Sequence, residues 1–163
     1  SNPGFPVLLC SLAKWLSGKE TILGSFGLPV QPPAGILNES DRARIQTGRL
    51  STEGESEEFY RRALRLLGKC GIPAAFVSSF SDIDSTLWEK FPYNERVSQR
   101  FYGLFHWDGT PKAAAKLIFE SSRRRDQGGA DWSWIDMDPK DYAGNPSENL
   151  KHLYGKFRDW AGN

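Results

Sequence analysis

The stretch that decides the fold is AAFVSSF, residues 74–80. This short run of apolar and β-prone residues follows a break at Gly71 and Pro73, and it predicts a buried strand. A second run of this kind, TILGSFG at residues 21–27, predicts a buried strand that leads into a loop. Apolar residues at helical spacing over residues 52–70 predict a helix between the two strands. Strand, helix and strand in this order predict a parallel βαβ unit.

Helices are predicted on both sides of this unit. Apolar residues at i, i+4, i+7 and i+8 over residues 6–16 predict an opening helix that Gly18 ends. Beyond the second strand, Thr110 is predicted to cap a helix that has Pro111 at its first position. The resulting alternation of helices and strands is typical of an α/β fold.

Two connections contain most of the polar loop residues. Residues 30–51 are rich in Pro, Gly and charge without periodicity, and a connection of this length in a compact domain is more often functional than idle. We therefore interpret it as a rim loop. Thr52 and Glu55 can form a capping box at the start of the following helix. The second loop begins at Asp82, at the end of the strand over residues 74–80.

The chain is predicted to consist of two parts. Residues 1–125 contain the alternating helices and strands, and residues 126–163 form a C-terminal extension. In the extension, Asn145 and Glu148 are predicted to cap one helix that has Pro146 at its first position. Because that helix has an apolar face, we expect it to pack on the first part.

Composition limits the classes of partner. The 163 residues are 39% hydrophobic, which is enough for a packed core, and the net charge of +1 gives no strong field for nucleic acid or an anionic membrane. The run RRR at residues 123–125 is interpreted as a solvated helix end that complements the helix dipole, with a nucleic-acid patch as the alternative. Cys10 and Cys70 fall on apolar helix faces outside any metal-ligand spacing, so we predict buried thiols, no metal and no cofactor. Neither a signal peptide nor a membrane span is predicted, and the sequence favours no particular compartment.

Three stretches, taken together in their order and spacing, resemble the end of a (β/α)8-barrel retaining glycoside hydrolase of the cellulase and mannanase type. They read ILGSFGLP, FVSSFSD and RFYGLFHWDGTPK, at residues 22–29, 76–82 and 100–112. In that family strand seven ends in Glu-Phe-Gly, strand eight ends in an aromatic segment, and a Gly-Leu-Phe turn precedes the last helix. The resemblance covers roughly residues 5–122. It implies a partial TIM barrel, with the last helix of unit six followed by βαβα and by an extra C-terminal helical extension.

The resemblance also implies where chemistry would occur. Members of the family cleave β-glycosidic bonds with two carboxylates about 5 Å apart, one a nucleophile and the other an acid and base. The nucleophile position corresponds to Ser25, and the strand that carries the acid and base has no counterpart in the sequence. Ser78 stands where members often have a Trp under the sugar, and Gln99 stands where they commonly have Glu. These changes imply a degenerate site.

The same mapping and the loop composition supply candidates for substrate binding. They are Phe26, Ser78, Phe80, Asp82, Trp88, Gln99 and Trp107. Trp88 and Trp107 are favoured because exposed aromatic rings in rim loops suit the flat faces of sugars. For Phe26, Phe80 and Phe101 the alternative interpretation is packing in the core or at the barrel mouth.

Two replacements for the missing nucleophile are considered. Asp82, Asp84 or Glu39 could supply a carboxylate, although carboxylates in polar loops are usually solvated. A Ser–His–Asp arrangement at Ser25 would need one of the two distant histidines, since none is near it in sequence.

The leading hypothesis is a fragment or split part of a barrel glycosidase that does not hydrolyse glycosides as this chain. The alternative is a non-catalytic protein that binds an oligosaccharide or polysaccharide, and a third possibility is a truncated product that aggregates. Two lone parallel strands need further partners, so we expect a missing N-terminal barrel segment or a homo-oligomer to complete the sheet.

Overall fold

The computed structural model describes residues 3–45, 50–121 and 129–162. These residues belong to two units. Unit 1 is formed by Ser25–Arg61 and Val77–Arg124, and unit 2 by Asn2–Gly24, Arg62–Phe76 and Arg125–Asn163. The run at residues 123–125 and the predicted boundary between residues 125 and 126 lie outside the described residues. None of the described helices is long and apolar enough to cross a membrane.

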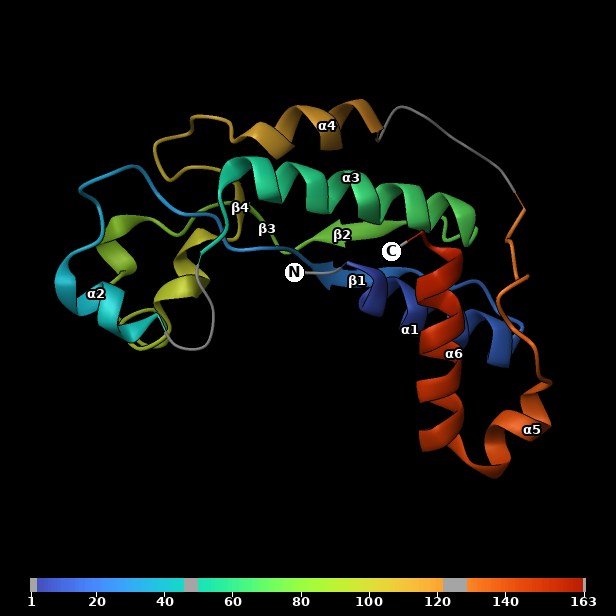
Figure 1. Ribbon diagram of the computed structural model, residues 1–163. Helices are drawn as coiled ribbons and strands as arrows, with labels where there is room; N and C mark the ends of the chain where they lie inside the picture. The colour runs from blue at the N-terminus through green and yellow to red at the C-terminus, as the bar shows by residue number, and fades with distance from the viewer. Residues whose placement is uncertain (1–2, 46–49, 122–128, 163) are drawn as a thin grey trace. The chain divides into compact units, whose positions relative to one another are not determined.

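Unit 2 is built around the opening helix. Helix α1 (Gly4–Ser17) ends at Gly18, which has a left-handed φ of 65° and donates its N–H to the carbonyl of Lys14, as predicted. Helix α6 (Pro146–Trp160) packs against α1 (Figure 1). The buried residues of this core include Leu8, Leu66, Cys70, Leu153 and Phe157. Both cysteines are buried and free, which confirms the buried thiols.

The C-terminal extension contains one helix more than the sequence predicted. Helix α5 (Pro139–Gly144) is capped by Asp138, whose carboxylate accepts the N–H groups of Lys140 and Asp141. Helix α6 has Pro146 at its start, as predicted, but the side chain of Asn145 makes no capping hydrogen bond, so that part of the prediction was wrong.

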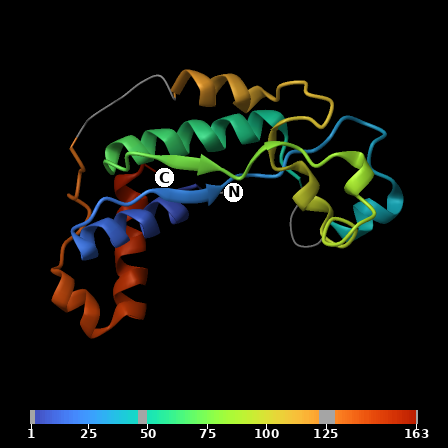
Figure 2. The same cartoon turned by 180° about the vertical axis from the view of Figure 1, so that it is seen from behind.

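The predicted βαβ unit is present. Strands β1 (Leu23–Phe26) and β2 (Ala75–Val77) pair with each other, and helix α3 (Glu53–Lys69) lies between them in sequence. The two arrows point the same way in Figure 2. The strands are not buried as predicted, since Gly24 and Ser25 of β1 are exposed and Phe76 of β2 is 59% exposed. One face of each strand is therefore open to solvent.

The strand predicted over residues 74–80 is interrupted at Ser78. After β2 the chain forms β3 (Ser79–Ser81), which pairs in parallel with β4 (Gly103–Phe105). A Cβ atom on Gly103 would lie 2.1 Å from the backbone nitrogen of Asp82 and 2.2 Å from the carbonyl carbon of Ser81. This close backbone approach is the physical reason for glycine at the start of the Gly-Leu-Phe segment, which is strand β4 rather than the expected turn.

The predicted start is correct for one helix of unit 1, α3, and wrong for another, α4. The capping box of α3 is confirmed: Thr52 N–H donates to the Glu55 carboxylate at 2.8 Å, and Glu55 N–H donates to the Thr52 hydroxyl at 3.2 Å. Helix α4 (Ala113–Ser121) begins later than predicted. Thr110 does not cap it, because Thr110 lies three residues before its first residue. The hydroxyl and the N–H of Thr110 both donate to Asp108. The first N–H of α4 donates instead to Glu53, sixty residues earlier in the chain.

The predicted rim loop of unit 1 is partly helical. Helix α2 (Glu39–Arg44) begins after Asn38, whose side chain accepts the N–H of Asp41 at 2.7 Å. The loop between β3 and β4 contains two 3-10 helices, η1 (Ser85–Leu87) and η2 (Val97–Phe101).

Candidate functional site

The residue at the predicted nucleophile position is near the end of β1. Ser25 is exposed, and its hydroxyl lies 3.2 Å from that of Ser78, which is also exposed. A hydroxyl has a much higher pKa than a carboxylate, so this pair offers no anion at neutral pH. The site therefore consists of two neutral donor–acceptor groups, one in β1 and the other between β2 and β3.

An aromatic cluster lies next to this hydroxyl pair. Phe26 is buried, with its ring centroid 6.3 Å from that of Phe59 and 5.6 Å from that of Tyr60. This is the packing role considered for Phe26 as the alternative to sugar contact. A Cβ atom on Gly27 would lie 2.9 Å from the Ser78 hydroxyl and 3.1 Å from the Tyr60 hydroxyl, so the three residues are closely packed. Burial raises the pKa of Tyr60 to about 12, which keeps its phenol neutral.

Phe80 has a different environment. Its ring is 68% exposed and stacks on Phe105, with the centroids 4.8 Å apart and the planes tilted by 29°. Phe105 also contacts Phe119 of α4 at 6.1 Å. The stacked rings present an apolar face that is open to solvent in unit 1, and such faces suit sugar C–H groups.

The two favoured tryptophans contact each other. The centroids of Trp88 and Trp107 are 5.7 Å apart in an edge-to-face arrangement, and both rings are partly buried. Trp88 is fixed further by its indole N–H, which donates to the carbonyl of Ile83 at 2.8 Å. Gln99 lies in η2, where its N–H bonds to the Arg96 carbonyl, and it is partly exposed. The structure therefore brings Trp88 and Trp107 together.

A buried ion pair supports this loop. Arg100 is 1% exposed, and its guanidinium lies 3.0 Å from the carboxylate of Asp41. The same guanidinium donates to the carbonyls of Tyr93 and Trp88 and lies 5.1 Å from the centroid of the Trp88 ring. Arg100 thus joins α2 to the loop between β3 and β4.

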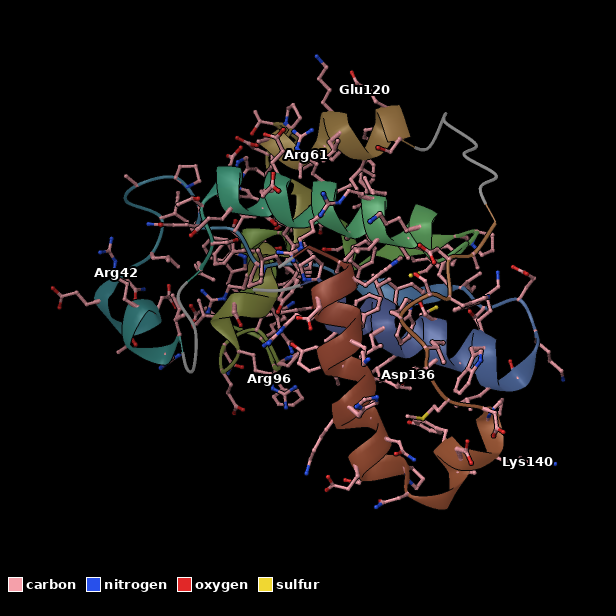
Figure 3. The ribbon with its side chains drawn as sticks, turned by 45° about the vertical axis from the view of Figure 1, so that its right-hand side comes forward. Arg42, Arg61, Arg96, Glu120, Asp136 and Lys140 are labelled. Atoms are coloured by element: carbon pink, nitrogen blue, oxygen red, sulfur yellow. The ribbon has the colours of Figure 1, made fainter. Side chains whose placement is uncertain are left out.

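A pocket of about 420 Å³ opens in the predicted rim loop. Its walls include the apolar residues Pro32, Leu37 and Leu50, and Arg42 contributes the charged group. The Arg42 side chain is labelled in Figure 3. A pocket of this size falls within the range of small-ligand sites.

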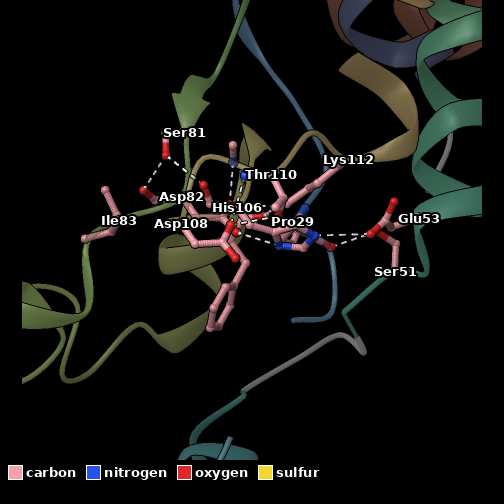
Figure 4. A network of polar contacts seen from close by, with 12 residues as sticks. Pro29, Ser51, Glu53, Ser81, Asp82, Ile83, His106, Asp108, Thr110 and Lys112 are labelled. Carbon is pink, nitrogen blue, oxygen red and sulfur yellow. Dashed lines mark hydrogen bonds and ion pairs between the residues drawn. The ribbon is translucent and has the colours of Figure 1, made fainter. Parts of the chain in front are cut away.

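Asp82 lies in a buried polar network rather than in solvent (Figure 4). One carboxylate oxygen accepts Lys112 Nζ at 2.6 Å and the N–H of Gly103 at 2.9 Å. Burial raises the pKa of Asp82 and lowers the pKa of Lys112, and their hydrogen bond opposes both shifts. The expectation of a solvated loop carboxylate was therefore wrong for Asp82, because Lys112, thirty residues away, pairs with it.

His106 and Glu53 extend the network. His106 Nε2 lies 3.2 Å from one Glu53 oxygen, and the other Glu53 oxygen accepts the N–H of Ala113 at 2.8 Å. On the opposite side of the ring, His106 Nδ1 lies 3.7 Å from the second oxygen of Asp82. The network connects the starts of α3 and α4 to the end of β3.

These contacts narrow the chemistry that the described residues can perform. The carboxylate of Asp82 forms an ion pair with Lys112. Asp84 is fully exposed, and hydrogen bonds from Thr86 lower its pKa. Glu39 is exposed in the first turn of α2. Within residues 3–45, 50–121 and 129–162, no group of three or more His, Cys, Asp or Glu side chains is arranged to hold a metal ion.

Sequence reasoning did not assign roles to Glu53, His106, Lys112 or the Arg100–Asp41 pair. The one local signal was the Lys after Thr-Pro in the stretch at residues 100–112, because a lysine directly before an apolar helix can turn inward. The other partners are far apart in sequence and have no spacing that would connect them.

The fold is similar to part of two solved glycoside hydrolases. One is the β-glucuronidase of Faecalibacterium prausnitzii, and the other is the β-glucuronidase of Bifidobacterium dentium complexed with coumarin-3-O-glucuronide. Each matches with a TM-score of 0.50 and 22% sequence identity, over 74% of this chain and 18% of that chain. No protein-family model and no curated protein matches the sequence. The chain thus spans about a fifth of these enzymes and shares the fold of that portion, which is a mixed arrangement of helices and small parallel sheets.

Proposed function

We propose that this chain is the C-terminal portion of a retaining (β/α)8-barrel glycosidase fold and does not hydrolyse glycosides as this chain. The fold shared with two β-glucuronidases supports the glycosidase origin. The TIM-barrel assignment and the cellulase or mannanase type come from the resemblance in sequence. Both β-glucuronidases are uronidases by name, so glucuronides belong among the substrates to be tested.

The observation that carries the proposal is the Ser25–Ser78 hydroxyl pair. In a retaining mechanism the nucleophile is an anion that later leaves from the sugar. A serine can form a covalent intermediate only with a neighbouring base, and the hydroxyl of Ser25 bonds to another neutral hydroxyl at 3.2 Å. Asp82 cannot substitute while Lys112 and Gly103 hold its carboxylate.

The test compares the native chain with Ser25→Glu and the matched control Ser25→Gln. Release of 4-nitrophenol from β-mannosides, β-glucosides and β-glucuronides is measured with the chain alone and with a separately produced barrel segment from a β-glucuronidase. We expect no turnover by the native chain in any mixture. If a mixture with the native chain hydrolysed a substrate and Ser25→Gln kept that activity, the nucleophile would be a residue other than Ser25. Clear turnover by the native chain alone would refute the proposal.

A second candidate function is carbohydrate binding without catalysis. It is favoured by Phe80, whose exposed ring is backed by Phe105 and so needs no ordering before a sugar packs on it. Calorimetric titration with β-linked oligosaccharides and methyl β-glucuronide tests it. Phe80→Leu should abolish the heat. Phe91→Leu, at a residue that is 73% exposed in the loop between β3 and β4, should leave it unchanged. Absence of heat with every sugar would reject this function.

The open strand faces also support a proposal about assembly. A homo-oligomer or a complementary barrel segment would cover the exposed apolar side chains and pair the strand edges. Sedimentation should therefore show an assembly larger than one chain. A monomer that melts cooperatively would contradict it.

A further inference from the structure

The pocket in the loop that follows β1 has mostly apolar walls and one charged side chain. Among the nine described residues that line it, Arg42 alone is charged. Six of the others have apolar side chains, and they are Pro32, Pro33, Ala34, Leu37, Ile45 and Leu50. Apolar walls with a few placed polar groups are the usual composition of a small-ligand site. The pocket, at about 420 Å³, therefore suits a small molecule with an apolar body.

Contacts behind the walls fix the shape of this pocket. The N–H of Gln31 donates to the carbonyl of Ser51 at 2.8 Å, which joins the two ends of the loop. Leu50 is 6% exposed and packs in one cluster with Val97 and Phe101, which are fully buried. A wall that is held from behind needs little ordering when a ligand binds, so less of the binding free energy is lost.

Arg42 lies where the pocket meets solvent, because it both lines the pocket and is exposed. Its Nε donates to the carbonyl of Leu37 at 3.4 Å, which keeps the guanidinium beside the wall. Within the described part of the chain, no carboxylate lies within ion-pair distance of this guanidinium. The neighbouring carboxylate of Asp41 is already paired with Arg100 at 3.0 Å. Most of the five N–H groups of Arg42 are thus available to an anion from solution.

We propose that this pocket binds a small organic carboxylate that has an apolar ring system. The ring system packs on Pro32, Leu37 and Leu50, and the carboxylate binds the Arg42 guanidinium at the mouth. The planar guanidinium suits this anion because it can donate two parallel N–H groups to the two carboxylate oxygens. The inference does not rest on the proposed glycosidase origin.

Titration of the ¹⁵N-labelled native chain with two matched probes tests the site. The probes are 2-naphthoate and its neutral amide, 2-naphthamide, which share one ring system and differ in charge. We expect saturable shifts of the Gln31, Leu37 and Leu50 amide signals with both. The dissociation constant of the carboxylate should be about fivefold smaller, the effect of a charge pair that is open to solvent. That preference should decrease as salt is added.

Either of two results with the native chain would overturn the proposal. One is the absence of a saturable shift at these three amides with 2-naphthoate at millimolar concentrations. The other is equal affinity for the carboxylate and the amide, since the charge of Arg42 would then have no role.

Two variants remove the same charge at different places. Arg42→Gln should bind the two probes with equal affinity, because the amide side chain has no charge to offer. The matched control is Arg61→Gln, on the exposed face of α3, where Arg61 pairs with Glu57 and Glu58. It should keep the fivefold preference. A preference that survives in Arg42→Gln would overturn the proposal, and so would its loss in both variants.

A third variant tests the apolar wall. Ala34 is exposed, so Ala34→Phe should leave the fold intact while it places a bulky ring at the pocket. Both probes should then bind more weakly than they bind the native chain. Unchanged affinity for both would show that the ring system binds elsewhere and would overturn the proposal.

Discussion

The Ser25–Ser78 hydroxyl pair and the Asp82–Lys112 ion pair lie in the same unit and differ in almost every property. The hydroxyls are exposed and neutral, and Ser25 stands where the resemblance places the catalytic carboxylate. The ion pair is buried, has pKa values shifted by burial, and lies where the sequence predicted an ordinary loop.

Shifted pKa values do not by themselves mark a catalytic residue. Those of Asp82 and Lys112 arise mainly from loss of solvent, and the contacts of the pair hold β3, β4 and the start of α4 together. Structural ion pairs shift pKa values for the same reasons as active sites. The hydroxyl pair, in contrast, is exposed and carries no charge.

The largest expected effect comes from breaking the ion pair on one side. Lys112→Met leaves the Asp82 carboxylate buried without its partner, and such losses cost about 3–5 kcal/mol. Chemical denaturation should show this reduction in the free energy of unfolding. The double variant Asp82→Asn, Lys112→Met should recover much of it, because no uncompensated charge remains. An Lys112→Met protein as stable as the native chain would show that the pair is not structural.

A smaller effect is expected from Tyr60, beside the hydroxyl pair. Its pKa of about 12 in the fold exceeds the ordinary value of 10, so the folded chain holds a proton that the unfolded chain releases. Stability is therefore complete below pH 10 and falls as pH rises from 10 to 12. At about 1.4 kcal/mol per unit, the loss is about 2–3 kcal/mol. Tyr60→Phe should lack this decline when the two unfolding free energies are compared across the range; an identical decline in both would contradict the burial argument.

Local signals explain which parts of the fold were predictable. Gly18 ended α1 because a left-handed residue can stop a helix, and the Thr52–Glu55 box started α3 through neighbours three residues apart. Such interactions are complete within a few residues. The βαβ unit followed from them and from the apolar runs.

Partners distant in sequence explain the errors. Asp82 is paired with Lys112, thirty residues on, and α4 starts where Glu53 accepts its first N–H, sixty residues away. The sequence around Thr110 satisfies the local rules for a cap, but the helix begins three residues later, at Ala113. Tertiary contacts overrode the local pattern at both places. The place of Ser25 at the end of a strand was predictable, and its role remains a prediction.

The smallest expected effect comes from crowding the hydroxyl pair itself. In Gly27→Ala the new Cβ would lie 2.9 Å from the Ser78 hydroxyl, 3.0 Å from Ser78 Cβ and 3.1 Å from the Tyr60 hydroxyl. Overpacking of this kind typically costs 1–3 kcal/mol, and we expect about 1 kcal/mol because Ser78 is exposed and can move. Combining Gly27→Ala with Ser78→Gly removes two of the three contacts, so the double variant should be less destabilised than the sum of the single ones. Additive losses of stability in thermal unfolding would mean that residues 27 and 78 are not in contact.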